Sequence, residues 1–309
     1  MNDPSVSVII PTYNRLRYVR EALDSVVAQT VRVAQTIVID DGSQEDIAAG
    51  VADHPAKPKV IRQARSGPGA ARNRGVAEST GDLVAFLDSD DLWLPQKLER
   101  YLEAMRRRPD YRIFYGPMSP VDQNLKAVPG RTKPCVDGWI TQALFNSSFV
   151  HVPTIVCRRD VLINSRGFNP ALPVCEDYEL WLRISVDMPF GLIEEPLALR
   201  RLHDSRLSKE RMDRNLFVKA KVLKEFYESG VAKTALEPVA ARARLARVFS
   251  HAAKAALREG RYQQALQLCR ESRHYGNSRL TVAPISLAAS TMSLFSSGKP
   301  EVALQPISQ

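Results

Sequence analysis

Three short apolar runs, each of which stops at a cluster of polar or acidic residues, constrain the fold of this chain most strongly. The runs are rich in Val, Ile and Leu, as expected for buried strands, and they occupy residues 6–10, 36–39 and 83–87. Segments with helical periodicity follow them, at residues 17–28, 69–79 and 95–107. Strands that alternate with helices predict an α/β fold with a mainly parallel sheet flanked by helices.

The residues that end these runs indicate a binding site. In parallel sheets ligands bind beyond the carboxyl ends of the strands, where Asp40-Asp41-Gly42-Ser43 and Asp88-Ser89-Asp90-Asp91 lie. Carboxylates gathered this closely repel one another unless a cation neutralises them, and their hard oxygen atoms suit Mg²⁺ or Mn²⁺. The alternatives are a solvated turn or a helix cap for the second cluster, and an Asx turn for the first.

A glycine-rich segment opens the helix at residues 69–79. Gly67-Pro68-Gly69 leaves backbone N–H groups accessible to an anion, and Arg72 follows within one helical turn. No Gly-Lys-Ser/Thr follows these glycines, so the segment is not a Walker phosphate-binding loop. This pattern favours contact with a phosphate group.

Taken together and in order, these segments resemble glycosyltransferase family 2. The matching segments are Ser7–Arg15 (SVIIPTYNR), the two acidic clusters, Gly69–Gly75 (GAARNRG), Arg166–Asn169 (RGFN), Glu176–Arg183 (EDYELWLR) and Arg200–Ser208. The resemblance covers residues 5 to about 208. It implies a GT-A fold, which is a Rossmann-like mixed, mainly parallel sheet, followed here by an α-helical C-terminal extension.

The resemblance also implies a nucleotide site. The residues that it assigns to the nucleotide are Pro11, Thr12, Tyr13, Asp40, Asp41, Arg72 and Asp88. Tyr13 would stack on the base in a pocket formed by the end of the first strand. Asp40 would recognise the base with help from Asp41. Arg72 would face the diphosphate, and Asp88 would lie near the ribose and the sugar.

Metal and base roles follow from the same resemblance. Asp90 would be the main ligand of Mn²⁺ or Mg²⁺, and His203 would approach the metal or the diphosphate from the far side. Asp177 would be the catalytic base that takes the proton of the acceptor hydroxyl. Glu176 is the competing choice for the base, and a helix N-cap is the structural alternative for Asp177.

These roles predict a metal-dependent, inverting glycosyltransferase of the hexosyltransferase type. It would move a sugar from a nucleotide diphosphate, UDP by default, to an acceptor hydroxyl on a saccharide or a lipid-linked glycan in cell-surface polysaccharide synthesis. A non-catalytic homologue that binds a nucleotide sugar and a sugar-nucleotide nucleotidyltransferase are the alternatives. Nucleotidyltransferases usually carry a glycine-rich loop after the first strand, where this chain has Pro11-Thr12-Tyr13-Asn14-Arg15.

The C-terminal third differs from the rest in charge. Residues 1–205 have a net charge of −1, whereas residues 206–279 have a net charge of +10. We predict a catalytic domain at residues 1–208 and a basic helical region at 209–309, with one tetratricopeptide-like hairpin. Contact with an anionic membrane surface is our hypothesis for this charge, and a solvated helical face is the alternative. We expect no nucleic-acid partner, because the region lacks interleaved aromatic residues.

The cysteines and the N-terminal residues bear on the cellular location, and the three tryptophans bear on the core and the acceptor site. The four cysteines form no CxxC pair, which favours free, buried thiols in a cytosolic protein, and the N-terminus does not resemble a signal peptide. We therefore expect a cytoplasmic protein, with peripheral attachment to the inner face of the membrane as a further hypothesis. Trp93 and Trp181 should lie in the core, whereas Trp139 could stack on a sugar.

Overall fold

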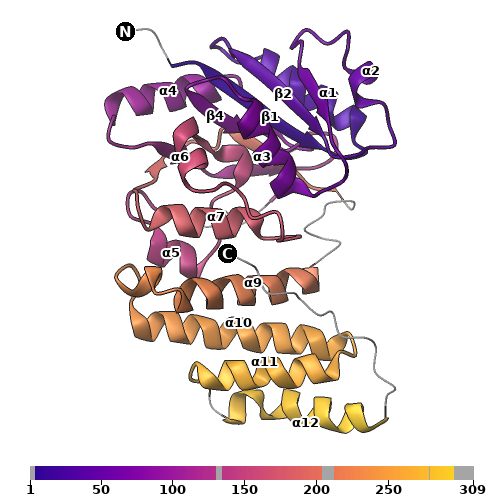
Figure 1. The fold of residues 1–309 in the computed structure, drawn as a ribbon, viewed down its shortest axis with the longest axis vertical. Helices are drawn as coiled ribbons and strands as arrows, with labels where there is room; N and C mark the ends of the chain where they lie inside the picture. Colours follow the sequence, from indigo (N-terminus) through magenta and orange to yellow (C-terminus); the bar gives the residue numbers. More distant parts are fainter. Residues whose placement is uncertain (1–3, 130–133, 204–211, 278, 296–309) are drawn as a thin grey trace. The chain divides into compact units, whose positions relative to one another are not determined.

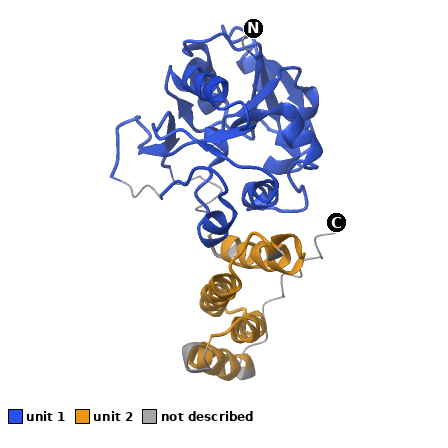
Figure 2. Ribbon diagram, turned by 90° about the vertical axis from the view of Figure 1, so that its left-hand side faces the viewer, with its two compact units in different colours: residues 1–204 blue, residues 205–309 orange. Residues whose placement is uncertain are grey.

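The chain forms two compact units, which are residues 1–204 and 205–309 (Figure 2). The computed structural model describes residues 4–129, 134–203, 212–277 and 279–295. The predicted boundary after residue 208 lies outside the described residues, so the division into a catalytic and a helical domain stays a prediction.

A seven-stranded sheet organises the first unit, with the strand order β3-β2-β1-β4-β8-β6-β9 (Figure 1). Strands β3, β2, β1 and β4 are parallel, and β8 runs antiparallel to β4 and β6. Their bounds are β1 Val6–Thr12, β2 Gln35–Asp40, β3 Lys59–Arg62, β4 Leu83–Phe86, β6 Ile113–Tyr115, β8 Val156–Arg158 and β9 Gly191–Leu192. The predicted fold, a mixed and mainly parallel GT-A-type sheet flanked by helices, is confirmed.

Alternation along the strands places apolar side chains on both faces of this sheet. Val8 and Ile10 pack into a core cluster with Leu23, whereas Ile37 and Ile39 point to the opposite face. The helices of this unit are α1 Leu16–Val27, α2 Ile47–Gly50, α3 Pro68–Glu78, α4 Lys97–Arg107, α5 Thr141–Asn146, α6 Arg159–Asn164 and α7 Glu176–Ser185.

Close approach of α3 to the sheet depends on a glycine. A Cβ atom on Gly75 would lie 2.3 Å from Cγ2 of Ile9, so only glycine lets the helix rest on β1 at this point. The start of α3 is thereby held near the carboxyl ends of the strands, where the predicted site residues lie.

Three short strands form a second sheet. Its order is β5-β10-β7, with β5 at Leu92–Trp93, β10 at Ala198–Arg201 and β7 at Met118–Val121. The apolar segment at residues 149–157 is a strand only at its end, because a 3-10 turn occupies Val152–Thr154 before β8 begins. Pro153 lies in this turn and cannot donate the backbone hydrogen bond that a strand residue would.

The tryptophans and cysteines lie in contrasting environments. Trp93 and Trp181 are buried, as predicted, whereas the exposed fraction of Trp139 is 66%. All four cysteines are free, but only Cys157 and Cys269 are buried. The expectation that all four are buried was therefore wrong for Cys135 and Cys175, which are half-buried.

The second unit is a stack of helices. They are α9 Met212–Glu228, a 3-10 turn at Val231–Lys233, α10 Pro238–Arg258, α11 Tyr262–His274 and α12 Arg279–Phe295. Viewed along their axes, α10 and α12 lie in one layer and α9 and α11 in the other (Figure 2). Tyr275 packs in this unit between Tyr227 and Phe249, at ring-centroid distances of 6.1 and 5.8 Å. No helix in the described parts of the chain is long and apolar enough to cross a membrane.

Candidate active site

The register of the parallel strands brings the first site residues to one edge of the sheet. Thr12 at the end of β1 pairs with Asp40 at the end of β2, which pairs with Arg62 at the end of β3. Beyond the strands, the backbone N–H of Asn14 donates to the Ser43 hydroxyl over 2.9 Å. The loops after β1 and β2, which contain the predicted base pocket, are therefore tied together.

Asp40 and Asp41 use their carboxylates differently. Asp40 accepts a hydrogen bond from the Ser43 backbone N–H at 2.9 Å, and its other oxygen lies 3.6 Å from the Arg62 guanidinium. Asp41 accepts from the Gln63 side chain and from the backbone N–H groups of the loop at residues 66–67, each at 2.8 Å. Asp41 thus holds the loop that leads into α3, and Asp40 is the residue with more capacity for a ligand.

Arg65 joins this edge and was missed from the sequence. Its guanidinium carbon lies 3.9 Å from the centre of the Tyr13 ring, and its Nη1 donates to the Tyr13 hydroxyl at 3.0 Å. Arg65 also lies against Gly42, where a Cβ atom would be 3.0 Å from the Arg65 backbone nitrogen. An arginine two residues before the Gly67 turn was the only sequence signal for this contact.

Arg72 links the two halves of the site. Its Nη2 donates to Asp88 at 2.8 Å, and its Nη1 donates to Glu176 at 2.6 Å. Burial alone would lower the pKa of Arg72, but the negative charges of Asp88 and Glu176 outweigh it and raise that pKa. Arg72 was predicted to face the diphosphate, and here it bridges the carboxylate after β4 and the start of α7.

Asp177 lies beside this bridge. The residue before Glu176, Cys175, has a φ of 63° and turns the chain into α7, so both acidic residues lie in the first helical turn. Burial, followed by the negative charge of Glu176, raises the pKa of Asp177 to about 7. The charge of Arg72 opposes this rise but does not cancel it. A carboxyl group with this pKa is suited to exchange a proton near neutral pH.

Hydrogen bonds join the segment at residues 69–75, which contains Arg72, to the segment at residues 166–169. Asn73 accepts a hydrogen bond from the Phe168 backbone N–H at 2.8 Å and donates to the Phe168 carbonyl at 2.7 Å. Gly69 allows the approach, because a Cβ atom there would lie 3.2 Å from Cγ of Glu176. These contacts fix the start of α3 against the segment that carries Glu176 and Asp177.

Asp90 and His203 form a second pair. The imidazole Nε2 of His203 lies 2.9 Å from Asp90 Oδ2, and Nη1 of Arg15 lies 2.5 Å from the same oxygen. Burial alone would raise the pKa of Asp90, but His203 and Arg15 outweigh it and hold that pKa below its usual value. The two predicted metal residues are therefore brought together.

A carboxylate and an imidazole are suitable donors for a divalent cation that takes its other ligands from diphosphate and water. Among the described residues, no group of three or more His, Cys, Asp or Glu side chains is placed to hold a metal ion. The pair therefore fits a metal only as a partial ligand set that a bound diphosphate would complete.

Comparison with known proteins identifies the family. Residues 7–161, half of the chain, match the family described as "Glycosyl transferase family 2". The chain belongs to glycosyltransferase family 2. It is 28% identical to an uncharacterized glycosyltransferase of Rickettsia felis over 69% of this chain and 36% of the relative. A second, from Haemophilus influenzae, is also 28% identical, over 66% of this chain and 70% of the relative.

The relatives differ from this chain in length, and solved structures share its fold. The chain spans about a third of the length of the curated relatives that it matches first. Residues 1–349 of Staphylococcus aureus TarS in complex with UDP superimpose with a TM-score of 0.65 and 17% identity, covering 98% of this chain and 97% of that one. The complex of TarS with UDP-GlcNAc gives a TM-score of 0.61 with 16% identity. These similarities show a shared fold.

In this family 2 chain, Arg201 contacts the segment that carries Asp90. Its side chain donates to the Asp90 carbonyl at 3.1 Å and forms an ion pair with Glu21. Its backbone N–H donates to Asp91 at 3.0 Å, and burial, followed by the charge of Asp90, raises the pKa of Asp91 well above its usual value. Arg201 and Asp91 were not predicted as site residues, because their contacts join segments about 110 residues apart in sequence.

Proposed function

We propose that this protein is a metal-dependent, inverting glycosyltransferase that moves a sugar from a nucleotide diphosphate, with UDP as the expected nucleotide, to an acceptor hydroxyl. The observation that carries the proposal is the bridge from Asp88 through Arg72 to Glu176. It joins the end of a nucleotide-side strand to the helix that begins with the candidate base, Asp177. A protein that only binds a nucleotide sugar would need the strand end with Asp88, whereas a transferase also needs the helix that carries Asp177.

The donor would bind along the edge formed by β1 and β2. Tyr13 would stack on the base through the ring face opposite Arg65, while Asp40 would accept from a base N–H. Arg65 itself would contribute a positive charge beside the nucleotide. Pro11, Thr12 and Asp41 complete the proposed nucleotide set, with Asp41 acting through the loop that it holds.

Asp177 would perform the proton transfer. The acceptor hydroxyl loses its proton as its oxygen attacks the anomeric carbon, and an ionised Asp177 would accept that proton. A single attack from the face opposite the departing diphosphate inverts the configuration. Asp90 and His203 would hold Mn²⁺ or Mg²⁺, which supplies Lewis-acid stabilisation of charge on the diphosphate when bound.

Trp139 and the basic C-terminal region bear on the acceptor and on the cellular location. A saccharide or lipid-linked glycan in cell-surface polysaccharide synthesis fits an exposed aromatic residue such as Trp139, whose ring is available for stacking on a sugar. We propose a cytoplasmic protein that binds the inner face of an anionic membrane peripherally through its basic C-terminal region.

Titration calorimetry with UDP, GDP and dTDP, each with and without Mn²⁺, tests the donor site. We expect one nucleotide to bind with a requirement for the metal that Asp90→Ala removes. Asp177→Asn should leave that binding unchanged but lower sugar transfer from the matching donor by about 10²- to 10⁴-fold.

Two results would count against the proposal. If no nucleotide binds under either condition, the chain keeps the family fold without the donor site. If a nucleotide binds but Asp177→Asn transfers sugar as well as the unaltered protein does, the base is another residue, and Glu176→Gln is the next variant to measure.

A further inference from the structure

Helix α10 carries a continuous row of basic side chains along its exposed face. The row consists of Arg244, Arg247, His251, Lys254 and Arg258, whose spacing alternates between three and four residues. Side chains at this spacing lie on one face of a helix. The row covers about 21 Å of the helix axis at a rise of about 1.5 Å per residue. Arg244 is half-buried and the other four are exposed.

Nothing acidic interrupts this row. The 21 residues of α10 include no Asp or Glu, and Glu237 and Glu259 lie just outside its two ends. Within the described residues, Arg247, Lys254 and Arg258 form no ion pair with a carboxylate. A solvated helix face normally carries both signs of charge, because pairs of opposite charge three or four residues apart stabilise a helix and like pairs destabilise it.

The groups of the row are close enough to affect one another. Partial burial lowers the pKa of His251, and the positive charges of Lys254, Arg244 and Arg247 lower it further. The row is thus unfavourable to the isolated helix, and a negatively charged partner would relieve the repulsion.

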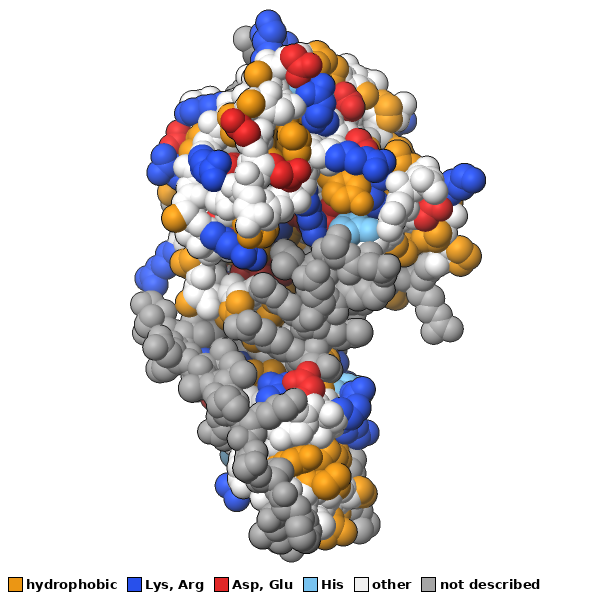
Figure 3. Space-filling view, turned by 90° about the vertical axis from the view of Figure 1, so that its right-hand side faces the viewer, with side chains coloured by type: hydrophobic (Ala, Val, Ile, Leu, Met, Phe, Trp, Pro, Cys, Tyr) orange, Lys and Arg blue, Asp and Glu red, His pale blue; other side chains and the backbone are white. Residues whose placement is uncertain are grey.

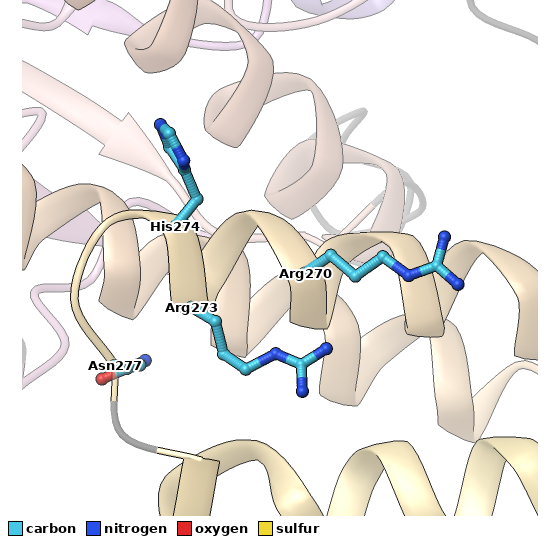
Figure 4. Close-up of a pocket in the computed structure, with 4 residues that line it drawn as sticks. All are labelled: Arg270, Arg273, His274 and Asn277. Carbon is cyan, nitrogen blue, oxygen red and sulfur yellow. The ribbon is translucent and has the colours of Figure 1, made fainter.

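The other basic cluster of this unit is arranged differently. Arg270 and Arg273 extend in the same direction from the end of α11, whereas the ring of His274 points away from them (Figure 4). These three residues and Asn277 line a shallow pocket. Asn277 already donates to the Ala246 carbonyl at 3.0 Å and to the Ser272 hydroxyl at 2.7 Å. These side chains do not converge on a ligand, but they provide a matched control for the row on α10.

We infer that the basic row of α10 is a docking surface for a membrane that contains anionic lipids. Mobile lipid headgroups can gather under a straight row of flexible Lys and Arg side chains without any requirement for a complementary shape. The inference rests on the peripheral membrane binding proposed above and names its surface, while its test does not depend on sugar transfer, because all residues of the row lie outside residues 1–204.

Two other anionic partners fit the surface less well. A protein interface usually has an apolar centre with aromatic or Met anchors. The positions that continue the face of the row toward the start of α10 are instead Ala240, which is half-buried, and Ala243, which is exposed, and the exposed Val239 beside them is neither aromatic nor Met. Single-stranded nucleic acid is usually bound with aromatic side chains between the basic ones, and the one aromatic residue of α10, Phe249, is buried.

Vesicle co-sedimentation of the full chain tests this inference. The vesicles contain phosphatidylcholine alone, or equal parts of phosphatidylcholine and phosphatidylglycerol. We expect binding only to the anionic vesicles, and we expect it to disappear at about 1 M salt, where charges are screened within a few ångströms. The double variant Arg247→Gln/Lys254→Gln should bind these vesicles about 30-fold more weakly.

The control is Arg270→Gln/Arg273→Gln, which removes the same charge from exposed positions on the neighbouring helix. We expect this control to weaken vesicle binding by less than about threefold, because its side chains belong to α11 and not to the row on α10. Circular dichroism spectra of both variants should match that of the unaltered protein.

Three outcomes would overturn the inference. Equal weakening by both double variants would show that net charge, rather than the row, drives binding. Unchanged binding in the α10 variant would show that the row is not involved. Binding to a short RNA at a salt concentration that releases the vesicles, if lost in the α10 variant alone, would identify the row as a nucleic-acid surface.

Discussion

Charged side chains are arranged differently in the two units of this protein. In residues 1–204, several buried charged side chains pair with charged groups that lie far away in the sequence. Arg72 lies between Asp88 and Glu176, and Arg201 contacts Glu21 and the backbone of Asp90. In residues 205–309, the exposed positive charges of α10 lie in a row with no acidic residue in the helix.

The space-filling view shows the same contrast. Acidic and basic side chains are interspersed on the visible surface of residues 1–204, whereas those visible on residues 205–309 are mainly basic (Figure 3). Paired charges in a buried cluster fix positions, as a reaction requires. Aligned charges on an exposed helix attract an extended anionic surface without fixing any geometry. The arrangement of charge therefore separates a candidate reaction site from a candidate docking surface more clearly than net charge does.

The largest effect should come from removing the central charge of the buried cluster. Arg72→Met keeps most of the side-chain volume but leaves Asp88 and Glu176 without their partner. Breaking a buried ion pair in this way costs about 3–5 kcal/mol, so we expect the free energy of unfolding of the first unit to fall by about 3 kcal/mol. Tryptophan fluorescence in a urea titration measures it selectively, because Trp93, Trp139 and Trp181 all lie in residues 1–204.

The matched change in the other unit is Arg247→Met on α10. It also removes an arginine charge, but from an exposed position, and surface substitutions of this kind alter stability by less than about 0.5 kcal/mol. If Arg72→Met changed stability as little as Arg247→Met does, the buried carboxylates would be satisfied without Arg72, and the proposed bridge would have no structural role.

Much of this contrast was predictable from residue identity, but the contacts were not. The positions of Asp40, Asp88 and Asp90 at strand ends follow from alternating strands and helices, and the structure brings Asp90 to His203. Arg72 is where the sequence placed it, at the start of α3, yet both of its Nη atoms contact carboxylates. A sequence motif specifies which side chain is present and not which partner it takes.

The elements that sequence reasoning missed depend on pairing between distant segments. Strand β7 at Met118–Val121 has four residues, including Pro120, and it becomes a strand by pairing with β10 about 80 residues later. Arg65 belongs to none of the recognised motifs, and its role appears only when the loop before α3 folds over Tyr13. Such contacts are set by tertiary packing, which local patterns do not encode.

A medium effect is expected in the pH dependence of sugar transfer. The pKa of Asp177 is raised to about 7 by burial and by the charge of Glu176. A base acts only when ionised, so the transfer rate should rise as the pH increases through about 7. Glu176→Gln removes one of the charges that raise this pKa and frees Arg72 from one partner. The midpoint of the rate profile should therefore move to lower pH, which initial rates across a pH series would show.

Glu179→Gln is the control for this shift. Glu179 lies in the same first turn of α7, but it pairs with Arg183 at 2.8 Å, and its charge is not among the causes of the shift in Asp177. Its removal should leave the midpoint in place. A midpoint that moves equally in both variants, or in neither, would mean that the Glu176–Asp177 pair does not set the pH dependence.

The smallest effect is expected for Arg247→Glu, which should change the stability of the second unit and its binding to vesicles in opposite directions. Arg247→Glu places a carboxylate three residues after Arg244, which replaces a pair of like charges with a pair of opposite charges. Such a pair is worth about 0.2–0.5 kcal/mol in a helix, so thermal unfolding followed by circular dichroism should show a small gain in stability. Vesicle binding should fall further than in Arg247→Gln, because repulsion is added to the lost attraction. If the variant loses both stability and vesicle binding, Arg247 supports the packing of the helices. A gain in stability together with a loss of vesicle binding would show that the row is retained for its partner.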